Sequence, residues 1–217
     1  YCYSQANSSV DSEIDEVVFN TLSNNTAGIC ATYSDFTYMV TDLFPLNEYN
    51  LNITIGTCGG NYNKGGKVFI DWNGNGNFYD QNEEVAILEL VNPTTTYNKN
   101  IEVPVSAISD SLLMRIVVAE IGGNANFNSV SEISPCGNYS WGETEDYTLY
   151  IHSPSSNDAG VSALEDLPMF TGNSDILISL KNYGLSTLNS ATINWSADGN
   201  IGVPFYWNGN LSAGNQE

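Results

Sequence analysis

Short strand-like runs recur along the whole 217-residue sequence. They are rich in β-branched and aromatic residues, often alternate apolar with polar positions, and are separated by clusters of Asn, Gly, Ser, Asp or Pro about every 8 to 15 residues. This spacing is typical of an all-β sandwich, of the jelly-roll or immunoglobulin-like kind. The expected strands lie within residues 13–22, 37–44, 48–57, 67–72, 83–91, 99–105, 112–120 and 145–152.

The strand pattern stops at IHSPSSNDAG, residues 151–160, and resumes within residues 160–166, 175–184, 191–199 and 202–214. We therefore predict a β-sandwich domain over 1–152, a linker over 153–157 and a second immunoglobulin-like β domain over 158–217. An immunoglobulin-like sandwich needs about 100 residues for its strands, whereas about 60 remain here. The second domain is expected to be incomplete, either because the chain is cut from a longer protein or because a partner supplies the missing strands.

The charge of the chain excludes several kinds of partner. Five Lys and Arg stand against 25 Asp and Glu, which gives a formal net charge of −20. Such a chain repels phosphate backbones and anionic lipids and attracts cations. No apolar run reaches the roughly 18 to 20 residues of a membrane-spanning helix. We expect no nucleic-acid partner and no direct membrane insertion.

The four cysteines, Cys2, Cys30, Cys58 and Cys136, are even in number and too widely spaced for a typical zinc site. Disulfides in an oxidising compartment explain them better than four buried thiols, although cytosolic chains also carry inert thiols. Of the three connectivities that four cysteines allow, we expect Cys2 with Cys30 and Cys58 with Cys136.

The segment DWNGNGNFYDQNEE, residues 71–84, combines acidic, Asn and Gly residues between two apolar runs. Counted from Asp71, oxygen-bearing side chains fall at positions 1, 3 and 5, and Gly76 follows at position 6, as in the first half of an EF-hand loop. Position 12 is Asn82 instead of Glu, and the flanks are strands instead of helices. We predict a weak Ca²⁺ site; the alternative is an Asn/Gly-rich turn that binds nothing. The expected ligands are Asp71, Asn73, Asn75, Asn77, Asp80 and Glu83.

Paired carboxylates occur in GETEDYTLYI, where strand alternation places Glu143 and Glu145 on one face and Asp146 on the other. Two carboxyls could serve general acid and base chemistry in a glycosidase cleft. The chain's single arginine, Arg115, lies within the apolar run LLMRIVV and needs a carboxylate partner if it is buried. We predict that Arg115 forms a structural ion pair with Glu143 or Glu145.

Other catalytic arrangements are absent from the sequence. His152 is the only histidine, and no nucleophile elbow, phosphate-binding loop or His-Glu-x-x-His motif occurs. We expect that the chain as given is not an enzyme. Aromatic residues near turns could instead stack on a sugar or a partner protein; these are Tyr1, Tyr3, Tyr62, Trp141, Phe205, Tyr206 and Trp207. We expect Trp72, Trp141 and Trp195 to fill the sandwich cores, as large residues on strands generally do. Tyr206 and Trp207 stay the candidates for stacking on a ligand.

The motif SWGETEDYTLYI, residues 140–151, resembles the signature of the GEVED domain. YCYS at the start, CATYSDFT at 30–37, VFIDWNGNGNFYDQNEEV at 68–85, LLMRIVV at 112–118 and PCG at 135–137 fit the same signature in order, over nearly all of 1–152. Thr144 stands where the family usually has Val. DAGVSAL and SLKNYGLST, within the last 60 or so residues, are similar to CARDB-type immunoglobulin-like domains, a less specific match.

The resemblance implies a β-sandwich module of large secreted or cell-surface proteins of Bacteroidetes-type bacteria. The leading hypothesis is therefore a non-catalytic, extracellular, calcium-binding module that acts in adhesion or as a spacer. Its partners would be other domains of the same long chain and a surface glycan or protein ligand. The alternative is a carbohydrate-binding accessory domain of a secreted hydrolase.

Overall fold

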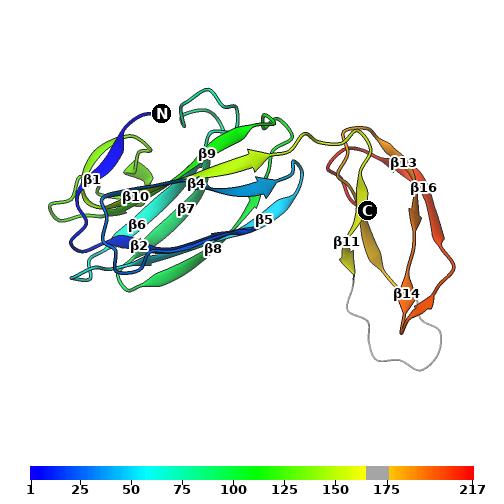
Figure 1. The fold of residues 1–217 in the computed structure, drawn as a ribbon, viewed down its shortest axis with the longest axis horizontal. Helices are drawn as coiled ribbons and strands as arrows, with labels where there is room; N and C mark the ends of the chain where they lie inside the picture. Colours follow the sequence, from blue (N-terminus) through cyan, green and yellow to red (C-terminus); the bar gives the residue numbers. More distant parts are fainter. Residues whose placement is uncertain (165–175) are drawn as a thin grey trace. The chain divides into compact units, whose positions relative to one another are not determined.

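The structure, a computed structural model, describes residues 1–164 and 176–217. These residues form almost only strands; they contain no α-helix, and one 3-10 turn covers Val130–Glu132. The chain divides into two compact units, Tyr1–Ser153 and Pro154–Glu217 (Figure 1). The all-β fold class predicted from the strand spacing is confirmed. Two expected runs, 160–166 and 175–184, extend into residues that lie outside the described ones.

The first unit contains a six-stranded sheet ordered around the long strand β10. Its path runs β1–β10–β9–β6–β7, and β4 also pairs with β10. One edge of β10 pairs antiparallel with β9, and the other edge pairs in parallel first with β1 and then with β4. The strands are β1 (Ser4–Ser8), β4 (Tyr33–Leu43), β6 (Lys64–Ile70), β7 (Glu84–Val91), β9 (Ser111–Glu120) and β10 (Gly137–Ile151).

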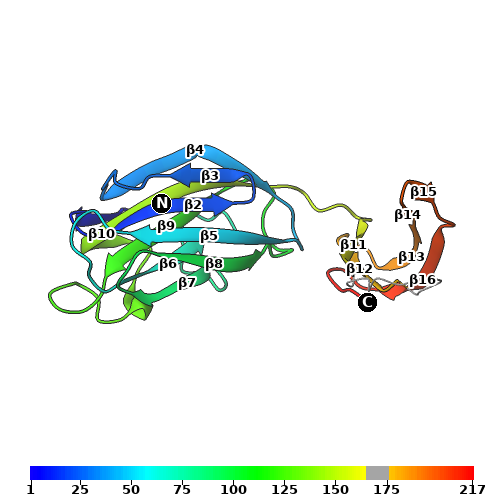
Figure 2. The ribbon, with the colours of Figure 1, turned by 90° about the horizontal axis from the view of Figure 1, so that it is seen from below.

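The second sheet of this unit is four-stranded and antiparallel, in the order β3–β2–β5–β8 (Figure 2). Its strands are β2 (Glu13–Phe19), β3 (Leu22–Asn25), β5 (Glu48–Gly56) and β8 (Thr95–Glu102). The strand expected over 13–22 ends at Phe19, because Asn20 takes a positive φ of 52° and turns the chain into β3, most of which lies beyond the expected run.

The main core lies between the two sheets. Alternate residues of β2 and β5, such as Val17 and Ile53, share one buried apolar cluster with Ile116 of β9 and Tyr147 of β10. Full burial of such a side chain contributes about 1.5 to 3 kcal/mol. Because this cluster joins both sheets, the first unit is a β-sandwich.

A second apolar cluster covers the other face of the six-stranded sheet and includes Phe69, Phe78, Val117 and Tyr139. β6 is consequently buried along its whole length. This explains why the β6 and β9 sequences are nearly continuous apolar runs instead of alternating ones.

Two disulfides close the first unit, and their connectivity corrects the expected one. Cys2 is bonded to Cys136, and Cys30 is bonded to Cys58. The predicted pairs Cys2–Cys30 and Cys58–Cys136 were wrong because parallel pairing of β1 with the start of β10 brings Cys2 next to Cys136. In the chain-entropy model, closing loops of these lengths stabilises the fold by about 3.5 kcal/mol for the shorter and 5 kcal/mol for the longer.

The second unit consists of small two-stranded sheets, β11 with β12, β13 with β16, and β14 with β15. Few of its described side chains are buried; Leu180 and Leu211 are the apolar ones, whereas Trp195 and Phe205 are exposed. Its strands are β11 (Ala159–Leu164), β12 (Ile178–Asn182), β13 (Leu188–Ile193), β14 (Ser196–Ala197), β15 (Asn200–Ile201) and β16 (Phe205–Leu211).

Within the described residues, no helix is long and apolar enough to cross a membrane. The two disulfides indicate that this chain folds in an oxidising environment.

Candidate functional site

The β6–β7 connection, residues 71–83, is anchored at both ends of the loop. The amide of Ile70 donates to the carbonyl of Glu83 at 2.9 Å, which closes the loop base. Trp72 and Phe78 are buried and belong to the two apolar clusters. The loop is therefore held by packing, while its polar residues surround the space between these anchors.

Asp71 is fully buried and organises the first half of the loop. Its carboxylate accepts hydrogen bonds from the amides of Asn75 at 3.2 Å and Gly76 at 2.8 Å and from the Tyr1 hydroxyl at 2.9 Å. Gly76 has a φ of 86°, in the left-handed region that favours glycine. These contacts are the sharp bend that the Asp-x-Asn-x-Asn-Gly spacing predicted.

Three asparagines continue the loop as successive side-chain-to-backbone turns. The side-chain oxygens of Asn73, Asn75 and Asn77 each accept from the backbone amide two residues further on, at 3.0, 3.0 and 2.8 Å. The amide nitrogens of Asn73 and Asn75 donate to Asp80 Oδ2 at 3.1 and 2.6 Å. These bonds hold the pKa of the exposed Asp80 below its usual value.

Glu83 brings an incompletely bonded carboxylate into this loop. It is 1% exposed, its Oε2 accepts from the Asp80 amide at 3.3 Å, and its Oε1 is buried with no hydrogen-bond partner among the described residues. Burial, and then the charges of Asp71 and Asp80, raise its pKa. An unpaired buried carboxylate oxygen costs about 1 to 3 kcal/mol or more, so a proton, a water molecule or a cation at this atom would stabilise the fold.

The loop donors fit a hard cation such as Ca²⁺, which takes six to eight or so oxygen ligands. Asp71, Glu83 and Asp80 supply carboxylates, and a rotation of each amide would present oxygen from Asn73 and Asn75. The three carboxylates do not, however, lie within 4.8 Å of one another in this structure. Because Asp80 is exposed, its side chain is the one free to move inward.

Arg115 pairs with a different carboxylate from those predicted. Its Nε and Nη2 donate to the two oxygens of Asp146, both at 2.7 Å, and Nη1 donates to the carbonyls of Cys2 and Pro135. The prediction that Arg115 meets Glu143 or Glu145 was wrong because the antiparallel register places Asp146 directly opposite Arg115, and neighbours on a strand point to opposite faces. The buried pair ties the Cys2–Cys136 region to the sheet.

Glu143 and Glu145 project from the other face of β10 toward β2. Glu143 accepts from the Ile14 amide and the Ser34 hydroxyl, both at 3.0 Å. Burial raises the pKa of Glu143 to about 7 and that of Glu145 to about 8, and the Glu143 charge adds to the shift at Glu145. Burial and then Glu13 raise the pKa of the neighbouring Asp15 to about 6. The charge of Lys64 acts on Asp15 in the opposite direction, and no described cation forms an ion pair with Glu143 or Glu145.

Glu145 accepts two side-chain hydrogen bonds. The Thr26 hydroxyl lies 2.7 Å from the Ile14 carbonyl and 3.3 Å from Glu145 Oε1, so its single hydrogen is shared between these two acceptors. Glu145 Oε2 accepts from the Tyr147 hydroxyl at 2.7 Å. Burial outweighs these two hydrogen bonds, and the raised pKa of about 8 favours the protonated form of Glu145 at neutral pH.

Gly142 begins the same motif for a steric reason. Its φ is 135°, and a Cβ at this position would lie 2.0 Å from the Val118 carbonyl oxygen. Only glycine allows β10 to approach β9 this closely. The segment Gly142–Asp146 thus combines one close backbone contact, two interior carboxyls and one ion-paired carboxylate.

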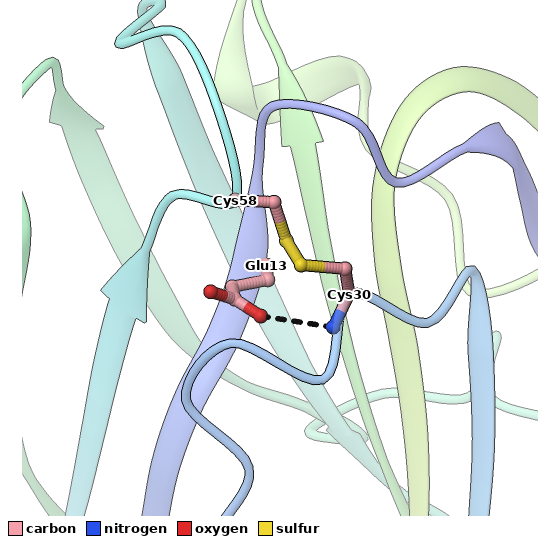
Figure 3. A group of neighbouring side chains, drawn as sticks. All are labelled: Glu13, Cys30 and Cys58. Carbon is pink, nitrogen blue, oxygen red and sulfur yellow. Dashed lines mark hydrogen bonds between the residues drawn. A yellow bond between two sulfur atoms is a disulfide. The ribbon is translucent and has the colours of Figure 1, made fainter.

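The buried side chain of Glu13 lies beside the Cys30–Cys58 disulfide (Figure 3). Glu13, Cys30 and Cys58 form the one described group of at least three potential metal-binding side chains within 4.8 Å. Both sulfurs are used in the disulfide, and the Glu13 carboxylate accepts from the amides of Gly28 and Cys30 at 3.0 to 3.2 Å. This group fixes the loop before β4 and is not a metal site.

The predicted stacking pair in the second unit does not form one surface. Tyr206 is 67% exposed, whereas Trp207 is partly buried and its indole nitrogen donates to Glu217 at 2.7 Å. Adjacent residues in β16 point to opposite faces of the strand. Each ring could contact a ligand alone, and the pair stays a prediction.

The fold and these contacts define the first unit as a disulfide-bonded β-sandwich module with buried acidic side chains in the β6–β7 loop and on both faces of β10. Within it, the sequence model of the GEVED domain matches residues 66–150. The matched segment runs from β6 to β10 and contains both the candidate loop and the Gly142–Asp146 motif. The match does not include the second unit, whose resemblance to CARDB-type domains stays a prediction.

Other comparisons add little. A Niemann-Pick type C2 protein from Japanese carpenter ant is similar in structure with a TM-score of 0.35 and 9% sequence identity, covering 70% of this chain and 99% of that one. At that level the likeness carries no functional argument. No curated protein matches the sequence significantly.

Sequence reasoning missed two interior acids, Glu13 and Asp15. Both lie in β2, where a bulge between Ile14 and Glu16 interrupts the alternation. The only signal was the acidic start of an otherwise apolar run, which also suits an exposed strand end.

Proposed function

We propose that the first unit is a non-catalytic, extracellular module whose β6–β7 loop binds Ca²⁺, and that it acts as an adhesive or spacing part of a longer protein. The observation that carries the calcium proposal is Glu83 Oε1, a buried carboxylate oxygen without a partner beside the fully buried Asp71. The GEVED match and the β-sandwich fold fit a module of this kind.

The chain's own residues would give the site its properties. Asp71 and Glu83 are fixed by burial, so they would form the rigid half of the site, and the exposed Asp80 would close it from solvent. Asn73 and Asn75 would add neutral oxygens. With few carboxylates, affinity should be of the extracellular kind, with a Kd on the order of 0.1 to 1 mM.

The test is thermal unfolding of the whole chain in 10 mM or so Ca²⁺, in Mg²⁺ and in EGTA. For that Kd, binding to the native state alone adds about 1.4 to 2.7 kcal/mol of stability. We expect this gain with Ca²⁺ and its loss in Asp71→Asn and Glu83→Gln. Glu89→Gln, which alters an exposed carboxylate on β7, is the matched control and should keep the full gain.

Terbium luminescence gives a second measurement, because Trp72 adjoins Asp71 and can sensitise a bound lanthanide. We expect luminescence that Ca²⁺ displaces in the wild type and in Glu89→Gln. Absence of both the stability gain and displaceable luminescence would reject the calcium proposal.

A further inference from the structure

A second cavity of the first unit lies away from the β6–β7 loop, at the ends of β9 and β10. It has a volume of about 490 Å³, within the range of small-molecule sites. Its walls come from four separate segments of the chain. Its lining includes Asp11, Tyr62, Glu120, Gly123, Asn124 and Trp141.

Two aromatic rings border this cavity, and neither fills the core. Tyr62 is 51% exposed in the β5–β6 loop, and Trp141 is partly buried on β10. Neither the Tyr62 hydroxyl nor the Trp141 indole nitrogen makes a hydrogen bond with any described residue. Flat rings with unused polar atoms at a cavity wall are suited to binding an amphipathic ring.

Two carboxylates supply acceptors beside the rings. Glu120 is 8% exposed; its Oε1 accepts from Ser12 at 3.1 Å, and its Oε2 accepts nothing within the described part of the chain. Asp11 Oδ1 accepts from the Gly60 amide at 2.7 Å, which fixes the carboxylate and leaves Oδ2 free of described partners. The hydrogen bonds to Ser12 and Gly60 orient the buried Glu120 and the partly buried Asp11 before any ligand arrives.

The lining also includes donors without described hydrogen-bond partners. Gly122 and Gly123 have φ values of 84° and 61°, so the chain turns sharply there and a Cβ on either would meet open space. Gly122 donates its amide to Phe127, but the Gly123 amide and the Asn124 side chain have no hydrogen-bond partner among the described residues. The cavity therefore offers both donors and acceptors.

We propose that this cavity binds a neutral carbohydrate, with Tyr62 and Trp141 contacting the faces of the sugar and Glu120 and Asp11 accepting from its hydroxyls. A hydroxyl both donates and accepts, so a sugar can use every free group of the wall. An anionic ligand would be repelled by the two carboxylates, because the lining contains no Lys or Arg. An organic cation would leave the Trp141, Gly123 and Asn124 donors unused. This proposal is independent of the calcium loop.

The test is affinity electrophoresis of the whole chain in native gels containing β-glucan, xylan, galactomannan or starch, run in EGTA to separate it from the calcium proposal. Polygalacturonate is the anionic contrast, and choline, measured by tryptophan fluorescence, is the cationic one. We expect at least one neutral polysaccharide to retard the wild type.

Substitutions in the lining test whether the polysaccharide binds in this cavity. Tyr62→Ala, in an exposed loop, and Trp141→Ala should each weaken retardation at least tenfold, and Glu120→Gln should weaken it about tenfold, since a hydrogen bond to a charged group is lost. If Trp141→Ala does not fold, Trp141→Phe replaces it, because this variant keeps an aromatic ring in the wall and removes the indole N–H. Tyr38→Ala removes a more exposed tyrosine, on β4, and should leave the retardation unchanged.

Three results would overturn the proposal. They are failure of every neutral polysaccharide to retard the protein, equal retardation of Tyr62→Ala and wild type, and binding of polygalacturonate or choline that Tyr62→Ala abolishes.

Discussion

Buried acidic side chains lie on both faces of β10, and their surroundings differ. On one face, Asp146 is buried and meets Arg115 through two hydrogen bonds of 2.7 Å. On the other, Glu143 and Glu145 are equally buried, and no described cation faces them. The first carboxylate is paired with a guanidinium, whereas burial raises the pKa of Glu145 to about 8. The two faces of β10 thus differ in whether a basic side chain lies opposite the buried acid.

The β6–β7 loop adds a third case. Asp71 and Glu83 are buried like the β10 acids and lie next to the exposed Asp80; Asp71 accepts three hydrogen bonds, whereas Glu83 Oε1 has no partner among the described residues. We propose an exchangeable cation from solvent as the neutralising charge at this position. Burial alone does not distinguish Asp146, the β10 glutamates and the loop acids. They differ in their access to solvent and in the side chains that the opposing strand presents.

The largest effect should come from breaking the ion pair. Arg115→Met leaves Asp146 buried without its partner, and removal of one member of a buried pair costs about 3 to 5 kcal/mol. Urea unfolding measures this loss. The double variant Arg115→Met with Asp146→Leu should recover a large part of it, because no unpaired charge remains. Equal stability of Arg115→Met and the wild type would show that the pair is unimportant.

The interior face should respond to pH in the opposite sense from an ion-paired carboxylate. The pKa of Glu145 is about 8 in the folded state and about 4.3 in an unfolded chain. Its stabilising contribution is complete below the unfolded pKa and is lost as pH rises through the folded pKa. The acidic groups that act on it are Glu143 and Glu13, and the loss should steepen as Glu143 ionises, since burial raises the pKa of Glu143 to about 7.

Glu145→Gln tests this sign. The wild type should lose up to about 1.4 kcal/mol per pH unit through this group between about pH 5 and 8, and the variant should lack that part of the slope. Chemical unfolding at several pH values in EGTA measures the difference. Parallel curves for the two proteins would contradict the protonation of Glu145.

A smaller effect should follow from removal of one hydrogen bond to Glu145. Tyr147 donates to Glu145 Oε2 and accepts from Asn24 at 2.9 Å. Tyr147→Phe should cost about 0.5 to 1.5 kcal/mol, measured by urea unfolding near pH 6. Tyr150→Phe, three residues further along β10 and 42% exposed, is the control. A cost as small as that of the control would show that the Tyr147 hydroxyl adds nothing.

Much of the strand inventory was readable from the sequence, and the exceptions are instructive. β1 was missed because SQANS has no apolar alternation. Its one apolar residue, Ala6, is buried, and the strand is held by parallel pairing with β10. For the candidate loop, the spacing after Asp71 predicted the bend that the structure contains. The unpaired oxygen of Glu83 could not be predicted, since burial of a side chain beyond the loop depends on packing.

The sequence by itself determined the all-β class, the positions of the turns and the alternation that separates Asp146 from Glu143 and Glu145. These are local properties, because a period of two and the turn residues act within a few positions along the chain. Tertiary structure decided which cysteines bond, which carboxylate meets Arg115, and which polar groups surround the Tyr62 and Trp141 cavity. Those outcomes depend on strand register and on contacts between segments more than 100 residues apart, such as Cys2 with Cys136, which no local pattern encodes.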